Sequence, residues 1–586
     1  GVLSAPDMFL LGFTMLDLAS HPFNRQGSEA INRLDVNGFI YSRGYSTEKV
    51  AKLQNYILMV IWSIQSDVTA AASYQDFVKH TLAFPRPTPF AWLLKGALYE
   101  KVVAPLEARL KSLGCEIRTG CKVSSVTLVN GEPRLRLERK GAKGGKPAAE
   151  AAPEADYLVL ATPAPALATL AMNGPPGGRI VDTLPRLSEL QRFRDVAIPV
   201  VDVYFTKTLP DIPKEQVGFT KSDIDLTLVD ISQLWTDDAN MKDRTVLVLA
   251  ASNGYALPSA EPLEQGHFII KRLHEYLPVF EPGDRWGDPK ADIDWDKTCF
   301  RSNEQNKLFI NDVGSWQWRP RAVYPEAPKI YFAGDFCQTD VDMATVEAAV
   351  QSGLMAARAL QAEDAKATGA RRGEPVTIAD HHIYSDAAFL AAKLLLLPLA
   401  YASTAWSAIT DRETILQKGP QPTDAYSPVT YTPLLPLAFA LDWWKTVYWL
   451  GRHIAAGETV QGHDELGAFS HAEPQAGRIA MAPGAVRAVM TPGGAEPAAA
   501  RSAGDHAAIG RAGALVGLGV STLMTAADVL QTLASRLPTG GEAAGSSNLA
   551  SALSAFSDQA WRTAQAAASQ FGAGQERYQR RWRVKP

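Results

Sequence analysis

One stretch, residues 329–360, constrains the fold more than any other part of the chain. It opens with a short apolar run, residues 330–333, which is typical of a buried strand. Gly334 and Asp335 end that run, and after a loop apolar residues recur at helical spacing. Asp342 is the expected N-cap of this helix. The stretch therefore predicts a strand, a Gly-Asp turn, a loop and a helix, in that order.

The chemistry of this predicted turn can be worked out from its residue types. A glycine at a strand end lets the backbone approach a ligand closely. The neighbouring carboxylate of Asp335 can accept hydrogen bonds from sugar-alcohol hydroxyls. Unpaired N–H groups at a helix start favour negative charge, which a reduced flavin carries on its pyrimidine side. The geometry suits a flavin, although an ordinary strand-to-helix turn has the same outline, and the pattern alone leaves both interpretations open.

A family resemblance favours the flavin. Tyr331-Phe332-Ala333-Gly334-Asp335, then Ala344-Thr345-Val346-Glu347-Ala348-Ala349 and Ser352-Gly353, resembles the C-terminal flavin-binding motif of the flavin amine oxidase superfamily. The phytoene and carotene desaturase branch of that superfamily looks most similar. The resemblance implies non-covalent FAD, because the cysteine motif that some amine oxidases use for covalent attachment has no counterpart. The implied cofactor-binding residues are Val123 (backbone, to adenine), Gly334, Asp335, Ala344, Thr345 and Val346.

The same resemblance sets the expected fold and its division. We expect an α/β protein with an incomplete FAD domain of the two-dinucleotide-binding type, an α+β substrate domain with an antiparallel sheet, and a long helical C-terminal extension. Trp316 and Trp318 would wall the substrate side of the flavin, or they are half-buried surface aromatics. The expected segments are 1–95 (helical, substrate domain), 96–170 (FAD domain), 171–321 (substrate domain), 322–365 (FAD motif), 366–460 (apolar extension) and 461–586 (Ala/Gly-rich tail with docking helices).

Local patterns predict the remaining elements. Asn130-Gly131 marks a hairpin turn, and Gly114 is placed to end a helix. The predicted helices are residues 8–18, 50–64, 93–113 and 268–277; the predicted strands are 115–118, 122–128, 134–138, 157–163, 198–206, 224–230 and 245–252.

The family's opening strand and G-x-G-x-x-G turn, which cradles the FAD pyrophosphate, has no match here. Gly517-Leu518-Gly519 comes nearest, but Thr522 stands where the last glycine is needed. Three accounts stay open: a fragment, a second polypeptide that supplies the glycine-rich half, or a degenerate homologue without FAD. In each case the phosphates of FAD would lack their donors within this sequence.

Composition excludes several classes of protein. The net charge of −4 over 586 residues gives no basis for binding a nucleic acid. The four cysteines form no C-x-x-C pair, and the adjacent His381 and His382 point apart on a helix, so we expect no metal site. Unpaired cysteines indicate a reducing compartment, and we expect a cytoplasmic protein that is peripheral at a membrane or free of it.

The extension is the apolar part of the chain. Residues 387–409 are almost continuously apolar apart from Lys393 and Pro398, and residues 433–450 carry several Trp and Tyr side chains. We expect helices that lie on one membrane leaflet, which fits an apolar, isoprenoid-type substrate, or a helix pair packed on protein.

Three functions follow from these observations. The first is an FAD-dependent oxidoreductase of the desaturase or dehydrogenase type, which takes a hydride from an apolar substrate and for which no catalytic residue is identified. The second is a non-catalytic scaffold or assembly subunit of a larger complex. The third is an amine oxidase proper.

Overall fold

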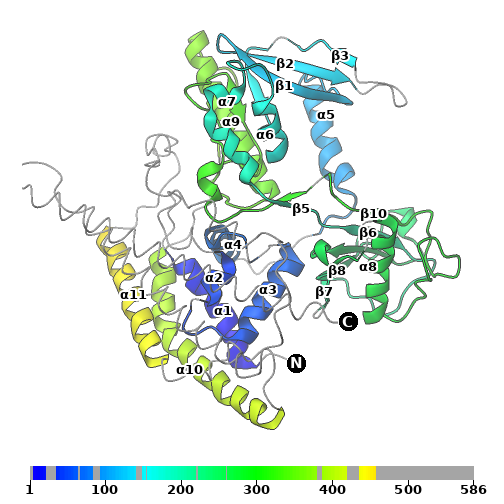
Figure 1. Ribbon diagram of the computed structural model, residues 1–586, viewed down its shortest axis with the longest axis vertical. Helices are drawn as coiled ribbons and strands as arrows, with labels where there is room; N and C mark the ends of the chain where they lie inside the picture. The colour runs from blue at the N-terminus through cyan, green and yellow to red at the C-terminus, as the bar shows by residue number, and fades with distance from the viewer. Residues whose placement is uncertain are drawn as a thin grey trace, which may run out of the picture.

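The computed structural model describes residues 4–21, 35–41, 43–63, 66, 68–83, 93–139, 148–153, 155–219, 222–258, 261–305, 307–378, 386–418 and 435–456. Residues 84–92, His381, His382, the Gly517-Leu518-Gly519 segment and the whole of 461–586 lie outside these ranges. Within them, Figure 1 shows three regions: a layered region with α9, a sheet region with α8, and a helical region with α10 and α11.

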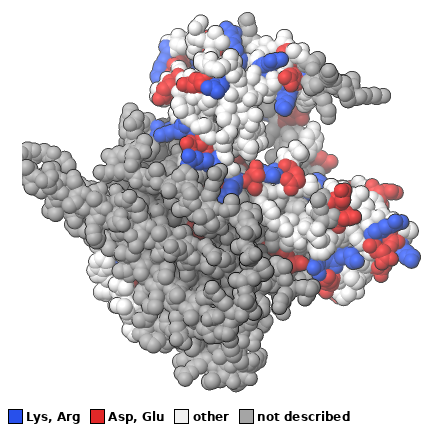
Figure 2. Space-filling model, in the orientation of Figure 1, with Lys and Arg blue, Asp and Glu red and all other residues white. Residues whose placement is uncertain are grey.

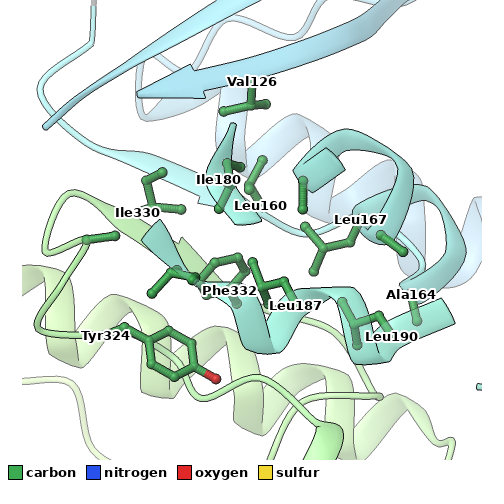
Figure 3. Packing of buried hydrophobic residues seen from close by; sticks show 14 of the residues in the cluster. Val126, Leu160, Ala164, Leu167, Ile180, Leu187, Leu190, Tyr324, Ile330 and Phe332 are labelled. Atoms are coloured by element: carbon green, nitrogen blue, oxygen red, sulfur yellow. The ribbon is translucent and has the colours of Figure 1, made fainter. Parts of the chain in front are cut away.

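The layered region is built around two short parallel strands. β12 (Ile330–Phe332) pairs with β4 (Leu158–Leu160), with Ile330 opposite Leu158 and Phe332 opposite Leu160. Alternate side chains of a strand point to opposite faces, so Ile330 and Phe332 face one core and Tyr331 the other. Helix α6 (Ala164–Met172) and the 3₁₀ segment η4 (Pro185–Arg192) cover the first face, as Figure 3 shows, and α9 (Val346–Thr368) covers the second.

An antiparallel hairpin completes this region. β1 (Cys121–Val129) pairs with β2 (Glu132–Arg139), which pairs with β3 (Ala148–Glu150). Asn130 and Gly131 both have positive φ, 53° and 81°, as a two-residue turn between twisted strands requires. Val126 of β1 is buried in the same apolar cluster as Leu160 and Ile330. The short helix α7 (Ile180–Thr183) contributes Ile180 to that cluster.

The sheet region has five antiparallel strands in the order β10-β6-β9-β8-β7. Its apolar face packs against the amphipathic helix α8, through Ile269, Ile270 and Leu273. The bounds are β6 Val200–Tyr204, β7 Val217–Gly218, β8 Leu226–Asp230, β9 Val246–Ala251, β10 Cys299–Arg301 and α8 Pro262–Tyr276, and a separate pair is formed by β5 (Asp195–Val196) and β11 (Leu308–Phe309). The strands and the helix predicted for this part of the sequence are confirmed in outline.

The helical region joins the beginning of the chain to the extension. Helix α1 packs along α10, and α10 packs along α11. The bounds are α1 Ala5–Ser20, α2 Val36–Tyr41, α3 Glu48–Trp62, α4 Ala71–Ala83, α10 Asp386–Lys418 and α11 Leu435–Ala456. The helices predicted at 8–18 and 50–64 are confirmed, and Pro398 lies inside α10 without ending it.

Two local predictions are wrong. The helix expected from residue 93 starts only at Leu98, with a π-helical turn η2 (Tyr99–Val103) before α5 (Ala104–Ser112). Gly114 does follow it, at a φ of +82°. Residues 115–118 have strand-like composition, yet they form no strand, because they pair in a ladder with no strand of the described chain; Arg118 meets β3 only through its side chain, 3.7 Å from Glu150.

The charged residues of the described surface are mixed in sign. Figure 2 shows Lys and Arg lying next to Asp and Glu over the layered and sheet regions. Many of them form local pairs, such as Arg139 with Glu150 and Arg301 with Asp202. On the face shown, no field of one sign is present that would attract a polyanion.

Candidate functional site: the strand end and helix start around Asp335

Gly334 is the second residue after β12, and only glycine fits there. Its φ is +147°, a conformation that L side chains rarely adopt. A Cβ atom at this position would lie 2.4 Å from the ring of Phe336. The Gly334 N–H donates to the hydroxyl of Ser352 at 2.8 Å, which ties the strand end to the second turn of α9. The backbone therefore turns sharply and closely at the place where the sequence predicted a ligand.

Asp335 follows in a half-buried position rather than on a solvated surface. Burial raises the pKa of its carboxyl group above the usual range for aspartate. The positive charge of Arg319 opposes that rise in pKa, as do the backbone N–H groups of Asp335 itself and of Phe336. A partly desolvated carboxylate with a cation nearby is a good acceptor for ligand hydroxyls.

Arg319 is the centre of a buried polar cluster that the sequence did not reveal. Its side chain is 1% exposed and forms an ion pair with Asp342. The rings of Trp316 and Phe309 lie on either side, 5.3 and 5.4 Å from the guanidinium carbon. This arrangement fixes a permanent positive charge beside Asp335, at the junction of β12 and the loop before α9.

Asp342 is held from several directions, and it is not the helix cap that the sequence predicted. Its carboxylate accepts hydrogen bonds from Ser73 Oγ at 3.0 Å and from Asn311 Nδ2 at 3.1 Å. Its backbone N–H donates to Asp76 Oδ2 at 2.6 Å. Since Ser73 and Asp76 belong to α4, the loop that precedes α9 is anchored to the helical region. Tertiary pairing with Arg319 takes the carboxylate that the local pattern assigned to a cap.

The N-cap of α9 is Thr345, whose hydroxyl accepts from the Ala348 N–H at 3.2 Å. Ala344 and Thr345 are half-buried, whereas the Val346 side chain is 77% exposed. The described chain thus leaves the outer side of this helix start open. The helix is 23 residues long, so its N-terminus carries the partial positive charge that favours an anionic group.

Val123 lies on β1, at the point where the β1–β2 register shifts between Val123 and Ser125. Its side chain is half-buried and packs on the same apolar cluster that includes Phe332 and Phe336. One core therefore supports both the strand assigned to adenine and the strand end that carries Asp335. Which atoms of Val123 would meet a ligand stays a prediction.

The two predicted substrate-side tryptophans have different surroundings. Both belong to the 3₁₀ segment η7 (Ser315–Trp318). Trp316 lies against Arg319, next to the polar cluster. Trp318 packs near Phe193 at 6.2 Å between ring centroids, and the Arg192 guanidinium carbon is 5.4 Å from its ring. The structure brings Trp316 to the candidate site, while Trp318 is engaged by its own neighbours.

Other reactive groups do not gather in this part of the chain. Among the described residues, no group of three or more His, Cys, Asp or Glu could hold a metal ion. Cys337 is buried in the apolar cluster beside Phe336, and burial raises the pKa of its thiol well above the usual range. It is therefore a packing residue and a poor nucleophile.

These features form a site at the carboxyl end of a parallel strand, with a glycine turn, a shielded carboxylate and an open helix start. The residues present fit a flavin at that end, because a Cβ-free turn, an acceptor carboxylate and a helix N-terminus are all in place.

Comparison with protein families gives the same answer. Residues 77–361 match the family model of the flavin containing amine oxidoreductases, which supports the flavin amine oxidase superfamily and, at the coarse level, an FAD-dependent oxidoreductase. The mixed helices and antiparallel sheets are consistent with an α/β flavoprotein-type fold. No curated protein matches the chain.

Proposed function

We propose that this chain is an FAD-dependent oxidoreductase that removes a hydride from a C–H bond of an apolar, isoprenoid-type substrate. The observation that carries the proposal is the Gly334–Asp335 turn, closed on one side by Ser352 and electrostatically supported by Arg319. The family match over residues 77–361 supports the flavin but leaves the desaturase type and the substrate to this proposal.

The residues of the chain would divide the work as follows. Asp335 accepts hydrogen bonds from the hydroxyls of the ribityl-pyrophosphate part, and its carboxylate is kept charged by Arg319. The backbone at Thr345 and Val346, at the open start of α9, faces the pyrimidine side of the ring and favours negative charge there. When bound, the flavin supplies the hydride-accepting chemistry, while the protein orients the partners and shields them from water.

The substrate would lie between the flavin and the five-stranded sheet, with Trp316 as one wall. Trp316, in the 3₁₀ segment η7, lies against Arg319, with 5.3 Å between its ring centroid and the guanidinium carbon. A substrate that loses only hydride and a proton to solvent needs little more than an apolar, well-shaped site. Such a reaction is compatible with the described residues near Asp335, among which we assign no general base.

A direct test measures flavin binding rather than turnover. Asp335→Ala should lower the affinity for FAD by about tenfold or more, because it removes charge-assisted hydrogen bonds of roughly 1.5–3 kcal/mol. The matched control is Asp364→Ala. Asp364 lies on α9, away from the turn, and its carboxylate pairs with the exposed Arg372, so this change should leave the affinity for FAD unchanged. Equal affinities for FAD in the Asp335→Ala and native proteins would refute the proposal.

A second candidate function, assembly with another polypeptide, is favoured by one specific observation. No residue of η2 or α5 is buried, although Tyr99, Val103, Leu106 and Leu110 lie on them. Val346 and Val350 of α9 and Val159 of β4 are exposed as well. A strand–helix unit with a glycine-rich phosphate turn, docked beside β4, would cover these residues and supply the pyrophosphate donors.

This docking has its own test. Mixing the chain with a polypeptide that carries such a unit should make FAD binding at least about tenfold tighter, since the missing phosphate contacts would be restored. A colourless complex that forms in stoichiometric amounts and never binds FAD would instead support the non-catalytic scaffold.

A further inference from the structure

In the layer formed by α1, α10 and α11, the described charged side chains are buried. In the centre of the layer formed by α1, α10 and α11, Lys393 of α10 lies 2.5 Å from the Asp17 carboxylate of α1. Tyr45 also donates to Asp17, at 2.6 Å, and the Arg43 guanidinium lies 3.7 Å from it. The side chains of Asp17 and Lys393 are 0% and 2% exposed. This charged cluster is buried beside apolar core residues of the same helices, such as Leu10, Phe13 and Leu397, whereas charged side chains of a water-soluble helix bundle normally lie at its surface.

The second pair of helices repeats this pattern. On α11, Asp442 and Lys445 are both buried and lie 3.4 Å apart. Tyr401 of α10 donates to Asp442 at 2.5 Å. Asp7 of α1 is also buried and accepts a hydrogen bond from Ser407 of α10 at 3.0 Å. Each acidic or basic side chain described on α1, on residues 387–407 and on residues 435–451 therefore points inward.

The outer face of the same helices is apolar. Among the side chains described on residues 387–407 and 435–451, none of the exposed ones is charged. The large exposed ones are Leu395, Leu396, Leu399, Trp406, Leu437, Trp443, Trp444 and Val447. By length and composition, residues 387–407 could also cross a membrane. Only 39% of this apolar stretch is buried inside the structure.

Helix α8 of the sheet region shows the opposite arrangement. It buries Ile269, Ile270 and Leu273, and it places Arg272 at its surface, paired with Glu275 and Asp223. That is the order expected of a helix in contact with water. In the α1–α10–α11 layer the placement of charge is inverted relative to α8: the charged groups lie inside, beside an apolar core that includes Leu10, Phe13 and Leu397, and the described outer face is apolar. Such an inversion is stable where the surrounding medium is hydrocarbon.

We infer that the outer face of α10 and α11 contacts the acyl chains of a lipid bilayer. A bilayer is favoured over a protein partner because interfaces between proteins have polar rims, and the described part of this face has no charged side chain. The exposed tryptophans add to this, since Trp prefers the boundary between acyl chains and headgroups. The inference is independent of the flavin site and can fail without it.

Flotation with phosphatidylcholine vesicles tests the inference on the full chain. The native protein should float with these uncharged vesicles equally well in low and high salt, since the face carries no charge. Replacing two half-exposed leucines, Leu399→Gln with Leu437→Gln, should lower the partition coefficient about tenfold or more. The control, Tyr255→Gln with Leu263→Gln, changes two large residues of the sheet region that are at least as exposed as Leu399 and Leu437, and it should float like the native protein.

Three results would overturn the inference. The native chain could remain unfloated, the Leu399/Leu437 variant could float like the native chain, or that variant could lose self-association in sedimentation, which would identify a second copy as the occupant. A second measurement on the native protein keeps the inference testable if the Leu399/Leu437 variant misfolds. Brominated phosphatidylcholine should quench the tryptophan fluorescence of the native protein, and Trp443→Phe with Trp444→Phe should remove much of that quenching; no quenching of the native protein would also overturn the inference.

Discussion

Two buried ion clusters with similar chemistry are placed in very different settings. Around Arg319, the guanidinium pairs with Asp342 and still acts on a second carboxylate, Asp335, at the turn proposed to meet the cofactor. Around Asp17, the charges of Lys393 and Arg43 and the hydroxyl of Tyr45 all converge on one carboxylate. The comparison teaches that burial of charge alone does not mark a functional site; what marks it is a charge directed toward a group that is open to a ligand.

The largest expected effect comes from breaking the closed cluster. Lys393→Met removes the nearest cation from a carboxylate that is fully buried. We expect a loss of about 3–5 kcal/mol in the free energy of unfolding, measured by chemical denaturation in detergent or lipid. FAD affinity should not change in the protein that remains folded. Lys366→Met is the control, since Lys366 forms an exposed ion pair worth at most about 1 kcal/mol.

Breaking the other cluster should have two consequences. Arg319→Met leaves Asp342 with its hydrogen bonds from Ser73 and Asn311 but without a counter-ion. We expect a loss of about 3 kcal/mol in unfolding free energy and, unlike for Lys393→Met, weaker FAD binding as well. If both variants lowered the free energy of unfolding and neither changed the affinity for FAD, the distinction between the two clusters would be wrong.

A smaller effect is expected at the turn itself. Gly334→Ala must place a Cβ at a φ of +147° and against the Phe336 ring, so it should cost about 1–3 kcal/mol. Gly353→Ala, in α9 with open space around it, should stabilise by up to about 1 kcal/mol because alanine favours helix. Urea denaturation should therefore show changes in unfolding free energy of opposite sign for the two variants. That result would confirm that the conformation of the turn, rather than the loss of a glycine as such, causes the destabilisation.

The smallest effect is a dependence on pH. Because burial raises the pKa of Asp335 in the folded state, the folded protein binds this proton more readily than the unfolded chain. The contribution of Asp335 to stability is therefore largest below its unfolded pKa and falls as pH rises through the raised folded pKa.

Denaturation from pH 3 upward can check this sign. The native protein should lose stability relative to Asp335→Asn as pH increases through that window. In the Arg319→Met background the window should move to higher pH, because the opposing positive charge is gone. A difference that is flat with pH, or one of the opposite sign, would contradict the assignment.

Local patterns were enough for a good part of the fold. The Asn130-Gly131 hairpin and β12 with its Gly334 turn were predicted because their determinants lie within a few neighbouring residues. The strand predicted at residues 115–118 was wrong for the converse reason. Strand composition makes a strand only where a partner strand pairs with it, and these residues pair with no strand of the described chain.

The centre of the site was beyond reach of such patterns. Arg319 stands in an aromatic-rich run, and nothing in that run shows that it pairs with Asp342. Asp342 itself is held by Ser73, 269 residues away in the sequence. Its local context, shortly before a helical pattern, pointed to a cap, and only the tertiary structure shows that Thr345 takes that place. The signal that could have raised the question is an arginine directly before Pro320 and close to the flavin strand.

Helix α4 contacts both regions compared above, the end of α1 and the loop that contains Asp342. At the end of α1, Gln75 donates to the backbone carbonyls of Leu18 and His21. In the loop before α9, Ser73 donates to the Asp342 carboxylate, and Asp76 accepts from the Asp342 backbone N–H. A displacement of α1 would therefore strain the hydrogen bonds through which α4 holds the loop before α9. The position of the residues that lead into the long helix thus depends on contacts made at the beginning of the chain.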